Sequence, residues 1–417
     1  MNILLIHQYF LEKGDGGGSR FNEMSQEWSR QGHTVTVLSG MVHYSTGKKL
    51  DRYKGKYTFF DKDFYPGVHV LRSHVSESYN VNFIGRLWGY FSFVFSSLFT
   101  GIFKTNKKFD IILVTSPPLF VGITAYILSK VKSIPFVFEI RDLWPESAID
   151  NGVLQNKFLI KFAYWFEAFM YKKAVLINTL TPAFRDKLIT EKKVPSEKII
   201  MIPNASDFSL AEKLSSNFNA MEFKKELGFS DKFVITYVGA HGLANDLFQL
   251  ILVAEELKNT NVIFQLIGDG MQKEFLVSEA KKRNLKNVIF RNSVSKQEVF
   301  KYILSSDVGV SILKKVDTFK TIYSNKTFDY MSCKIPILLA IDGVSRDLIE
   351  KANCGLYAEP ENISEISMAV KKLMNLPKEE LKSMGENGYN YAKIHFDRVV
   401  LAEKYMQELM QKTNYVS

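Results

Sequence analysis

The chain has 417 residues, more than one hydrophobic core usually holds, so at least two domains are expected. Hydrophobic residues make up 46% and charged residues 24%, a globular composition that excludes an intrinsically disordered protein. Lysine and arginine outnumber aspartate and glutamate by 54 to 44, which favours an anionic partner such as a phosphorylated ligand or an acidic membrane surface. The basic residues are scattered rather than gathered into one arm, so no nucleic-acid partner is expected.

Short hydrophobic runs alternate with amphipathic stretches through the first half of the chain. The runs are continuous in Val, Ile and Leu, as expected of parallel strands that are buried on both faces. Strands are predicted at residues 3–6, 34–38, 68–71, 111–114, 136–140 and 175–178, with helices such as 20–31 and 159–172 between them. The opening run is interpreted as the first buried strand and not as a signal peptide.

The same pattern restarts after a polar, linker-like stretch at residues 203–219. Strands are predicted at residues 233–238, 262–267, 288–290, 308–312 and 335–340, and a last helix at 399–412. We therefore predict an α/β protein of two Rossmann-like, doubly wound domains that face a cleft. The expected boundaries are 1–205 for the first domain and 206–395 for the second, with residues 396–417 packing back on the first domain.

The two cysteines, Cys333 and Cys354, lie apart and lack the spacing of a metal site. Neither a disulfide framework nor a metal centre is expected, and a reducing cytoplasm is the predicted compartment.

A glycine-rich segment follows the first predicted strand and opens the first helix. Gly16, Gly17 and Gly18 would let backbone N–H groups approach an anion at the helix N-terminus, although a surface loop is the simpler alternative. A nicotinamide site would need a carboxylate at the end of the second strand. That strand ends Val37-Leu38-Ser39-Gly40 and has none, so the pattern favours a phosphate or sugar-phosphate ligand.

The second domain repeats this device after its first two strands. Gly239 and His241 lie in a Gly-Ala-His-Gly turn, and Asp269 lies in a Gly-Asp-Gly turn. His241 is predicted either to contact the ligand or to be a structural turn residue, and Asp269 either to contact the ligand or to close an Asx-turn.

The segment 324–331 contains the most specific pattern, Ser-Asn-Lys-Thr-Phe-Asp-Tyr-Met. On a helix Lys326 and Asp329 share one face, where an ammonium suits a diphosphate and a carboxylate suits the two hydroxyls of a ribose. A surface ion pair between these two residues is the alternative.

Taken together, these motifs resemble the GT-B glycosyltransferases of family 4, and most closely the bacterial O-antigen and capsule transferases of the L-fucosamine subgroup. The resemblance covers essentially the whole chain. It rests on Gly16-Gly17-Gly18-Ser19-Arg20, Arg141-Asp142-Leu143-Trp144-Pro145-Glu146, Ile202-Pro203-Asn204, Gly268-Asp269-Gly270 and Asn325-Lys326-Thr327-Phe328-Asp329-Tyr330-Met331.

The resemblance implies a retaining transfer from a UDP-sugar, with the acceptor on the first domain, the donor on the second and no required metal or other cofactor. Lys326 would bind the diphosphate and stabilise the leaving group, and Asp329 would hold the ribose. The remaining donor contacts would come from Gly16, Gly17, Gly18, Gly239, His241, Asp269, Asn325 and the main chain of Ser293 and Val294.

The chain departs from the family pattern at two places. Asp329 replaces the second of two family glutamates, and Thr321 stands where the first is expected. The turn at 239–245 lacks the family's Arg and Lys, so Lys326, with Lys314 or Lys315, would neutralise more of the diphosphate.

Asp142 and Glu146 follow a predicted buried strand of the first domain. They are predicted to position or deprotonate the acceptor, with helix capping as the alternative for Asp142.

Residues 87–103 carry no charge and are rich in aromatic side chains. They are predicted to form a helix partly exposed to lipid; a core helix and a spanning helix are the alternatives. Nearby basic residues would add attraction to anionic headgroups, namely Lys48, Lys49, Arg52, Lys54 and Lys56.

The predicted function is transfer of an N-acetylamino sugar, such as N-acetyl-L-fucosamine, from a UDP-sugar to a polyprenyl-diphosphate-linked saccharide in capsule or O-antigen biosynthesis. The enzyme is expected in the cytoplasm, peripherally bound to the anionic inner face of the cell membrane. A UDP-sugar 2-epimerase and a non-catalytic sugar-nucleotide-binding protein are the alternatives.

Overall fold

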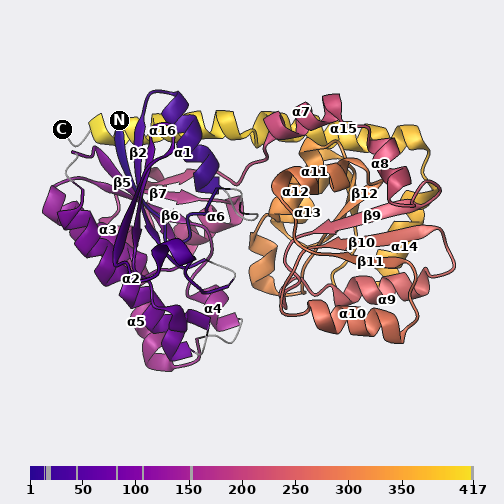
Figure 1. Cartoon of the computed structure of the whole chain (residues 1–417), viewed down its shortest axis with the longest axis horizontal. Coiled ribbons are helices and arrows are strands. Elements are labelled where there is room, and N and C mark those ends of the chain that lie inside the picture. The colour runs from indigo at the N-terminus through magenta and orange to yellow at the C-terminus, as the bar shows by residue number, and fades with distance from the viewer. Residues whose placement is uncertain are drawn as a thin grey trace. The chain divides into compact units, whose positions relative to one another are not determined.

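The computed structural model describes residues 1–13, 15, 20–43, 46–80, 83–105, 108–150 and 154–414 (Figure 1). The chain divides into two compact units, one containing residues 1–13, 20–203 and 399–414 and the other residues 204–398. The division after Pro203 lies close to the predicted boundary at 205, and the second unit extends to Arg398 instead of 395.

The first unit is built on an eight-stranded sheet in its described part, with the order β3-β4-β2-β1-β5-β6-β7-β8. Its neighbouring strands are parallel, except for the antiparallel pair β3 and β4 at one edge. The strands are β1 (Asn2–Ile6), β2 (Thr34–Gly40), β3 (Thr58–Tyr65), β4 (Val68–Ser73), β5 (Ile111–Ser116), β6 (Phe136–Ile140), β7 (Leu176–Thr179) and β8 (Ile199–Met201). The helices are α1 (Arg20–Arg30), α2 (Phe83–Phe103), α3 (Val121–Lys132), α4 (Glu146–Asp150), α5 (Lys157–Lys173), α6 (Pro182–Thr190) and α16 (Arg398–Asn414).

The second unit holds a six-stranded parallel sheet in the order β11-β10-β9-β12-β13-β14. Its strands are β9 (Phe233–Val238), β10 (Val262–Ile267), β11 (Val288–Arg291), β12 (Val308–Ile312), β13 (Ile337–Ala340) and β14 (Gly355–Tyr357). Its helices are α7 (Phe208–Asn217), α8 (Ala220–Glu226), α9 (Phe248–Glu256), α10 (Lys273–Lys282), α11 (Lys296–Leu304), α12 (Asn325–Ser332), α13 (Val344–Ala352), α14 (Ile363–Asn375) and α15 (Lys378–His395).

The prediction of two doubly wound α/β domains is confirmed. The predicted strands all occur, and the central ones are buried along their length because helices cover both faces. Three short or edge strands were missed, β3, β8 and β14. The predicted linker at 203–219 was too long, because Asp207 caps the N-terminus of α7 by accepting a hydrogen bond from Leu210 N.

The C-terminal helix α16 belongs to the first unit from Val399 onward. The buried indole of Trp28 on α1 donates a hydrogen bond to Ala402 O at 2.9 Å and lies edge-on to the ring of Tyr405. These contacts hold α16 against α1, so packing on the first unit, predicted for residues 396–417, is seen in the described chain from Val399 onward.

Helix α2 contains the charge-free stretch predicted at residues 87–103. One face is buried: Ser97 pairs with Thr124 of α3, and Thr100 pairs with Ser73 of β4. The opposite face leaves Trp88 and Phe95 55% and 57% exposed. The helix is therefore a crossover helix with an outward aromatic face, and among the described residues no helix is long and apolar enough to span a membrane.

Candidate functional site

The chain order of the second sheet reverses between its neighbouring strands β9 and β12. Loops that follow the strands on either side of such a reversal diverge and leave a crevice at the carboxyl edge of the sheet. Gly239 directly follows β9 here, and Lys326 in the first turn of α12 lies against it, since a Cβ on Gly239 would lie 3.3 Å from Lys326 Cε. Two of the predicted donor residues are thus brought together.

The two glycine-rich turns of the second unit interlock. His241 N donates to Asp269 O at 2.9 Å, and Gln272 N donates to His241 O at 2.9 Å. Gly268 has a φ of +147° and its absent Cβ would overlap the carbonyl oxygen of Gly239. Glycine is required there both by the backbone conformation and by the close approach of the other turn.

The side chain of His241 is fully buried between the rings of Tyr237 and Phe290. Both ring nitrogens lack a hydrogen-bond partner among the described residues. Burial lowers the pKa of His241 to about 4, so the imidazole is neutral at pH 7 and holds one N–H donor. Both ring nitrogens are unpartnered within that part of the chain, which is costly for a buried polar group, but the side chain is fully enclosed, so the ligand contact and the structural turn both stay predictions for His241.

Asp269 uses both carboxylate oxygens within the protein. One oxygen accepts from Lys273 Nζ at 2.7 Å and the other from Ser293 N at 2.7 Å. The Lys273 hydrogen bond, with that from Ser293, lowers the pKa of Asp269 to about 2. Asp269 thereby ties the loop after β10 to the loop after β11, a role that differs from both the donor contact and the Asx-turn considered for it. Of the predicted base-contacting residues, Ser293 is held at this edge by that hydrogen bond, and Val294 follows it in the chain.

Lys326 has no carboxylate within 4.0 Å of Nζ in the part of the chain that the structure describes. Its Nζ lies 3.3 Å from Ser324 Oγ and 4.8 Å from the centre of the Tyr237 ring. Burial lowers the pKa of Lys326 to about 8, and burial raises the pKa of Asp329 to about 6. The alternative of a surface ion pair between Lys326 and Asp329 is therefore wrong, and both groups are available to a ligand.

Three neighbouring residues considered in the sequence analysis, Asn325, Lys315 and Thr321, form contacts within the second unit. Asn325 Oδ1 accepts from Asn204 Nδ2 at 2.7 Å. Lys315 Nζ pairs with Glu359 at 2.8 Å, so it is less free than Lys326 to neutralise a diphosphate. Thr321, at the place of the expected acid, donates its hydroxyl to Thr318 O.

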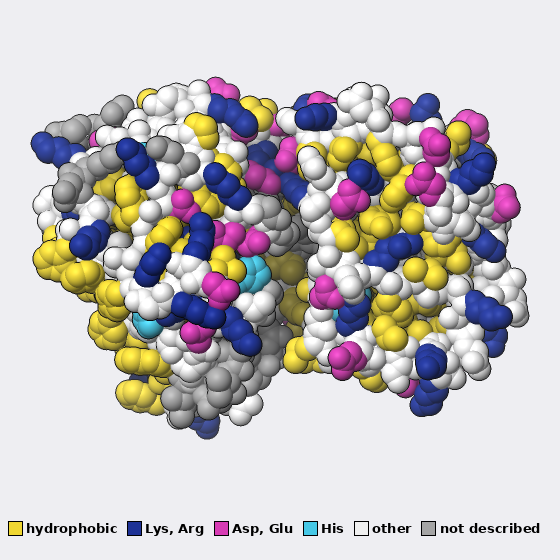
Figure 2. Space-filling model, in the orientation of Figure 1, with side chains coloured by type: hydrophobic (Ala, Val, Ile, Leu, Met, Phe, Trp, Pro, Cys, Tyr) yellow, Lys and Arg dark blue, Asp and Glu magenta, His cyan; other side chains and the backbone are white. Residues whose placement is uncertain are grey.

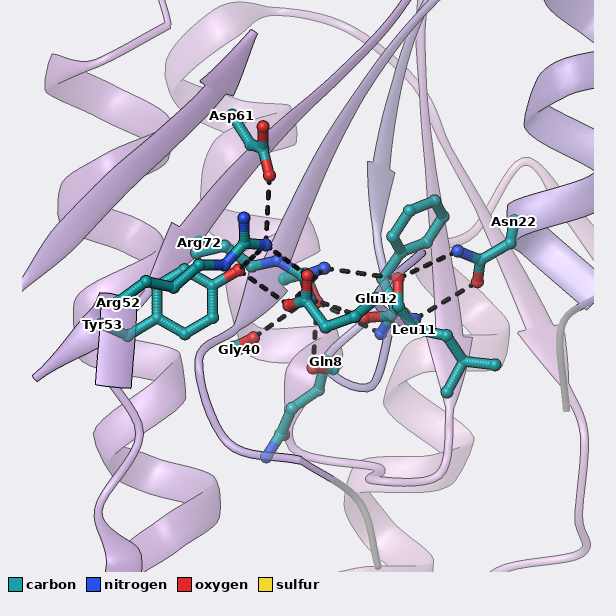
Figure 3. Close-up of polar contacts among 11 residues, drawn as sticks. Gln8, Leu11, Glu12, Asn22, Gly40, Arg52, Tyr53, Asp61 and Arg72 are labelled. Carbon is teal, nitrogen blue, oxygen red and sulfur yellow. Dashed lines mark hydrogen bonds and ion pairs between the residues drawn. The ribbon is translucent and has the colours of Figure 1, made fainter. Parts of the chain in front are cut away.

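In the first unit, a polar network fixes the segment that leads into the glycine-rich loop (Figure 3). Glu12 accepts from Arg52, from Arg72 Nη2 at 3.0 Å and from the Tyr53 hydroxyl at 2.7 Å. Asn22 of α1 exchanges two hydrogen bonds with the backbone of Leu11 at 3.2 and 3.0 Å. Gly16, Gly17 and Gly18 lie outside the described residues, but the chain before them is anchored. This network was not predicted, because its members come from distant segments.

Asp142 and Glu146 lie after β6 as expected, but in different environments. Burial raises the pKa of Asp142, whose carboxylate is bonded locally to Ser147 and to the backbone of Leu143. Glu146 pairs with Lys192 Nζ at 2.6 Å, and the same ammonium pairs with the buried Glu167 at 2.8 Å. Glu146 therefore belongs to an ion-pair network with Lys192 and Glu167, which could not be predicted from its position in the sequence.

Two buried groups near the carboxyl edge of the first sheet were also missed. His7 follows β1 and its Nδ1 lies 2.7 Å from Thr115 Oγ1 at the end of β5. Burial, with the charges of Arg141 and Arg72, lowers the pKa of His7 well below its ordinary value. Arg20 forms a buried ion pair with Glu139 of β6. This structural contact accounts for an arginine beside the glycines. No group of metal-ligating side chains occurs among the described residues.

Two family models match the chain, one in each unit. The model described as a glycosyl transferase 4-like domain matches residues 15–205, and that described as glycosyl transferases group 1 matches residues 219–391.

Two curated relatives support these matches. The putative colanic acid biosynthesis glycosyl transferase WcaI of Escherichia coli K12 is 23% identical over 395 residues, which are 91% of this chain and 93% of the relative. The alpha-D-kanosaminyltransferase of Streptomyces kanamyceticus is 21% identical over 265 residues, 63% of this chain and 67% of that enzyme.

Solved structures share the fold along the whole chain. Anabaena Alr3699/HepE in complex with UDP and glucose has a TM-score of 0.72 at 15% identity, covering 99% of this chain and 100% of that one. The trehalose-6-phosphate synthase OtsA has a TM-score of 0.74 at 10% identity, with 99% of each chain covered.

Proposed function

Because the chain belongs to the GT-B glycosyltransferases of family 4 that act in polysaccharide biosynthesis, we propose that it transfers a sugar from UDP to a polyprenyl-diphosphate-linked saccharide. The proposed donor carries an N-acetylamino sugar such as N-acetyl-L-fucosamine, and the product is a capsule or O-antigen precursor. The name of the E. coli relative supports a surface polysaccharide, and the UDP held by the Anabaena protein supports the nucleotide.

The observation that carries the proposal is Lys326, a half-buried ammonium without an acidic partner among the described residues, at the switch point of the second sheet. Breaking the bond between the sugar and the diphosphate builds negative charge on the leaving oxygen. A preorganised cation stabilises that charge without having to rearrange. The neutral, unpartnered His241 lies beyond Gly239 and supplies an N–H donor to the same ligand.

The proposed transfer retains the configuration of the sugar and uses no metal ion, as the family resemblance implies. The acceptor hydroxyl attacks the anomeric carbon on the face that UDP leaves, and the departing phosphate oxygen takes the acceptor proton. Of the two carboxylates after β6, Asp142 is the better candidate to position the acceptor, because Glu146 is paired with Lys192. In this proposal the enzyme binds the anionic inner face of the membrane, with the outward face of α2 towards lipid.

Calorimetric titration tests the ligand class. UDP should bind and NAD should not, since the second strand of the first unit ends at Gly40 without a ribose-binding carboxylate. Binding of NAD without UDP would overturn the assignment. Release of free UDP from the UDP-sugar only after an acceptor is added would exclude the epimerase and the non-catalytic alternatives.

Affinity for UDP should depend on pH through the two half-buried groups of α12. Lys326, with a pKa of about 8 in the free protein, loses its charge as the pH rises through 8, so binding should weaken above that value. Asp329, with a pKa of about 6, loses its charge as the pH falls through 6, so binding should also weaken below it. Calorimetry in two buffers of different ionisation enthalpy should show proton uptake on the alkaline side.

Lys326→Arg is the matched control for the alkaline limb, because arginine stays charged throughout this range. The alkaline loss should disappear in that variant while the acid loss persists. An unchanged alkaline limb would show that another group titrates there.

A further inference from the structure

We infer that α5 is a second lipid-contacting element, which joins α2 and α3 in one docking surface for an anionic bilayer. This inference rests on the proposed lipid-linked acceptor. It extends that proposal, because the helix predicted at residues 159–172 was given no role beyond that of a helix between two strands of the first domain.

Helix α5 carries a stripe of aromatic side chains on its outward face. Phe158, Phe162, Trp165 and Phe169 recur at the spacing of one helix face. That spacing normally marks a face packed on a core, yet Phe158 is 77% exposed and Trp165 59% exposed. The opposite face holds the buried Ala163, Phe166 and Met170, so the helix packs on the domain and still presents an apolar face.

The exposed charges on α5 all have one sign. Lys157, Lys161, Lys172 and Lys173 are exposed on α5, whereas its one acid, Glu167, is buried against Lys192 and Tyr171. Exposed aromatic side chains bordered by lysines suit the boundary between headgroups and acyl chains, and the lysines favour an anionic surface. A protein partner would need matching acidic and apolar groups, whereas a bilayer supplies both without a specific shape.

The stripe continues over the neighbouring helices. Helix α3 contacts both α2 and α5 and carries Lys130, the 57% exposed Val131 and Lys132, with no acid along its length. Helix α2 exposes Trp88, Phe95, Phe99 and Phe103 and is also free of acids. Figure 2 shows hydrophobic side chains gathered along the edge of the first unit where Figure 1 places these helices.

Stacked aromatic rings connect this surface with the loop after β6. Phe162 of α5 stacks on Phe120 at 6.3 Å between centroids, and Phe91 of α2 stacks on Phe120 at 5.0 Å. Phe120 in turn meets Trp144 edge-on at 5.8 Å, two positions after Asp142 in the chain. A prenyl chain in the bilayer would therefore lie near the loop proposed to position the acceptor.

By contrast, two of the basic residues predicted to attract headgroups, Arg52 and Lys54, are paired with acidic side chains. Arg52 is bonded to Glu12 and Asp61, and Lys54 pairs with Asp51. The lysines of α5 form no ion pair with a carboxylate among the described residues, so they are free for headgroups.

Vesicle binding of the full chain, measured without donor or acceptor, tests this surface. Phe158→Ser with Trp165→Ser should lower partitioning to phosphatidylcholine–phosphatidylglycerol vesicles by about tenfold or more, because large apolar side chains lose their burial. Lys161→Glu with Lys172→Glu should weaken binding only when phosphatidylglycerol is present. Phe60→Ser is the matched control, since Phe60 is 54% exposed on the edge strand β3 of the same unit, and it should leave binding unchanged.

A direct readout comes from the fluorescence of Trp165. In a Trp88→Phe background, brominated lipids should quench the part of the fluorescence that a further Trp165→Phe change removes, whereas the buried Trp28 and the half-buried Trp144 are present in both variants. Thermal unfolding of each variant should match the unmodified chain because the replaced side chains are exposed.

Three outcomes would overturn the inference. The first is that the α5 variants partition to vesicles as the unmodified chain does, while Trp88→Ser with Phe95→Ser abolishes vesicle binding. The others are the absence of Trp165 quenching and the dissociation of a dimer by the α5 changes. The last would identify the surface as an interface between two copies. Transfer to a water-soluble acceptor should survive all α5 changes. If the unmodified chain transfers no sugar but still binds vesicles through α5, the proposed function fails and the docking surface stands.

Discussion

Lys326→Ala is expected to lower kcat/KM by about thirty- to a thousandfold, which corresponds to about 2–4 kcal/mol of lost transition-state stabilisation. Among the described residues the ammonium forms no ion pair within 4.0 Å and lies against Ser324 Oγ and the face of Tyr237, so its charge is held for a ligand. The turn at 239–245 contains no other cation, and Lys315 is occupied by Glu359. Steady-state kinetics with a UDP-sugar and a soluble acceptor would measure the loss.

Two further variants show whether the loss is specific to the ammonium of Lys326. Lys372→Ala on α14 removes an exposed lysine and should leave the kinetics unchanged. Asp329→Ala should mainly raise KM, since the carboxylate is proposed to hold the ribose and not the leaving group. Near-normal turnover of Lys326→Ala would show that a different cation neutralises the diphosphate.

The strands that the sequence predicted best are those whose burial is uniform. β9, β10 and β12 begin and end at the predicted residues, because runs of Val, Ile and Leu buried on both faces differ sharply from the polar loops around them. β3 mixes Phe, Asp and Lys and lies at an edge, and β14 is three half-buried residues long. Neither has a composition that separates it from a loop.

Only the parts of the candidate site that are formed by local sequence motifs could be predicted. In the second unit, the two glycine turns and α12, which holds Lys326, occur at the places that the strand–turn–helix pattern predicts. The partners of Asp269 and Glu146 were not predictable, because Ser293 and Lys192 become neighbours only through the fold. The outward aromatic stripe of α5 shows a second limit, since an apolar helix face has the same periodicity whether it meets a core or lipid.

Arg20 belongs to the first glycine motif, but its ion pair with Glu139 indicates that its role is structural and not ligand binding. Arg20 lies two positions after the last glycine of this motif, where an arginine would suit a phosphate. Its guanidinium instead donates to both oxygens of Glu139 at 3.0 and 3.2 Å, to Ile202 O at 2.8 Å and to Pro203 O. Asn178 Nδ2 also donates to Glu139 at 2.9 Å, and both charged side chains are buried.

Glu139→Ala is therefore expected to lower the free energy of unfolding by about 3–5 kcal/mol, because it leaves the guanidinium buried without its counter-charge. Chemical denaturation followed by circular dichroism would measure the loss. The double variant Arg20→Met with Glu139→Leu should recover most of it, since a buried ion pair can be replaced by apolar side chains of similar volume at little cost. That double variant should also bind UDP as the unmodified chain does, because Arg20 is turned towards β6 and the end of β8. A folded double variant that no longer binds UDP would instead place Arg20 among the donor-binding residues.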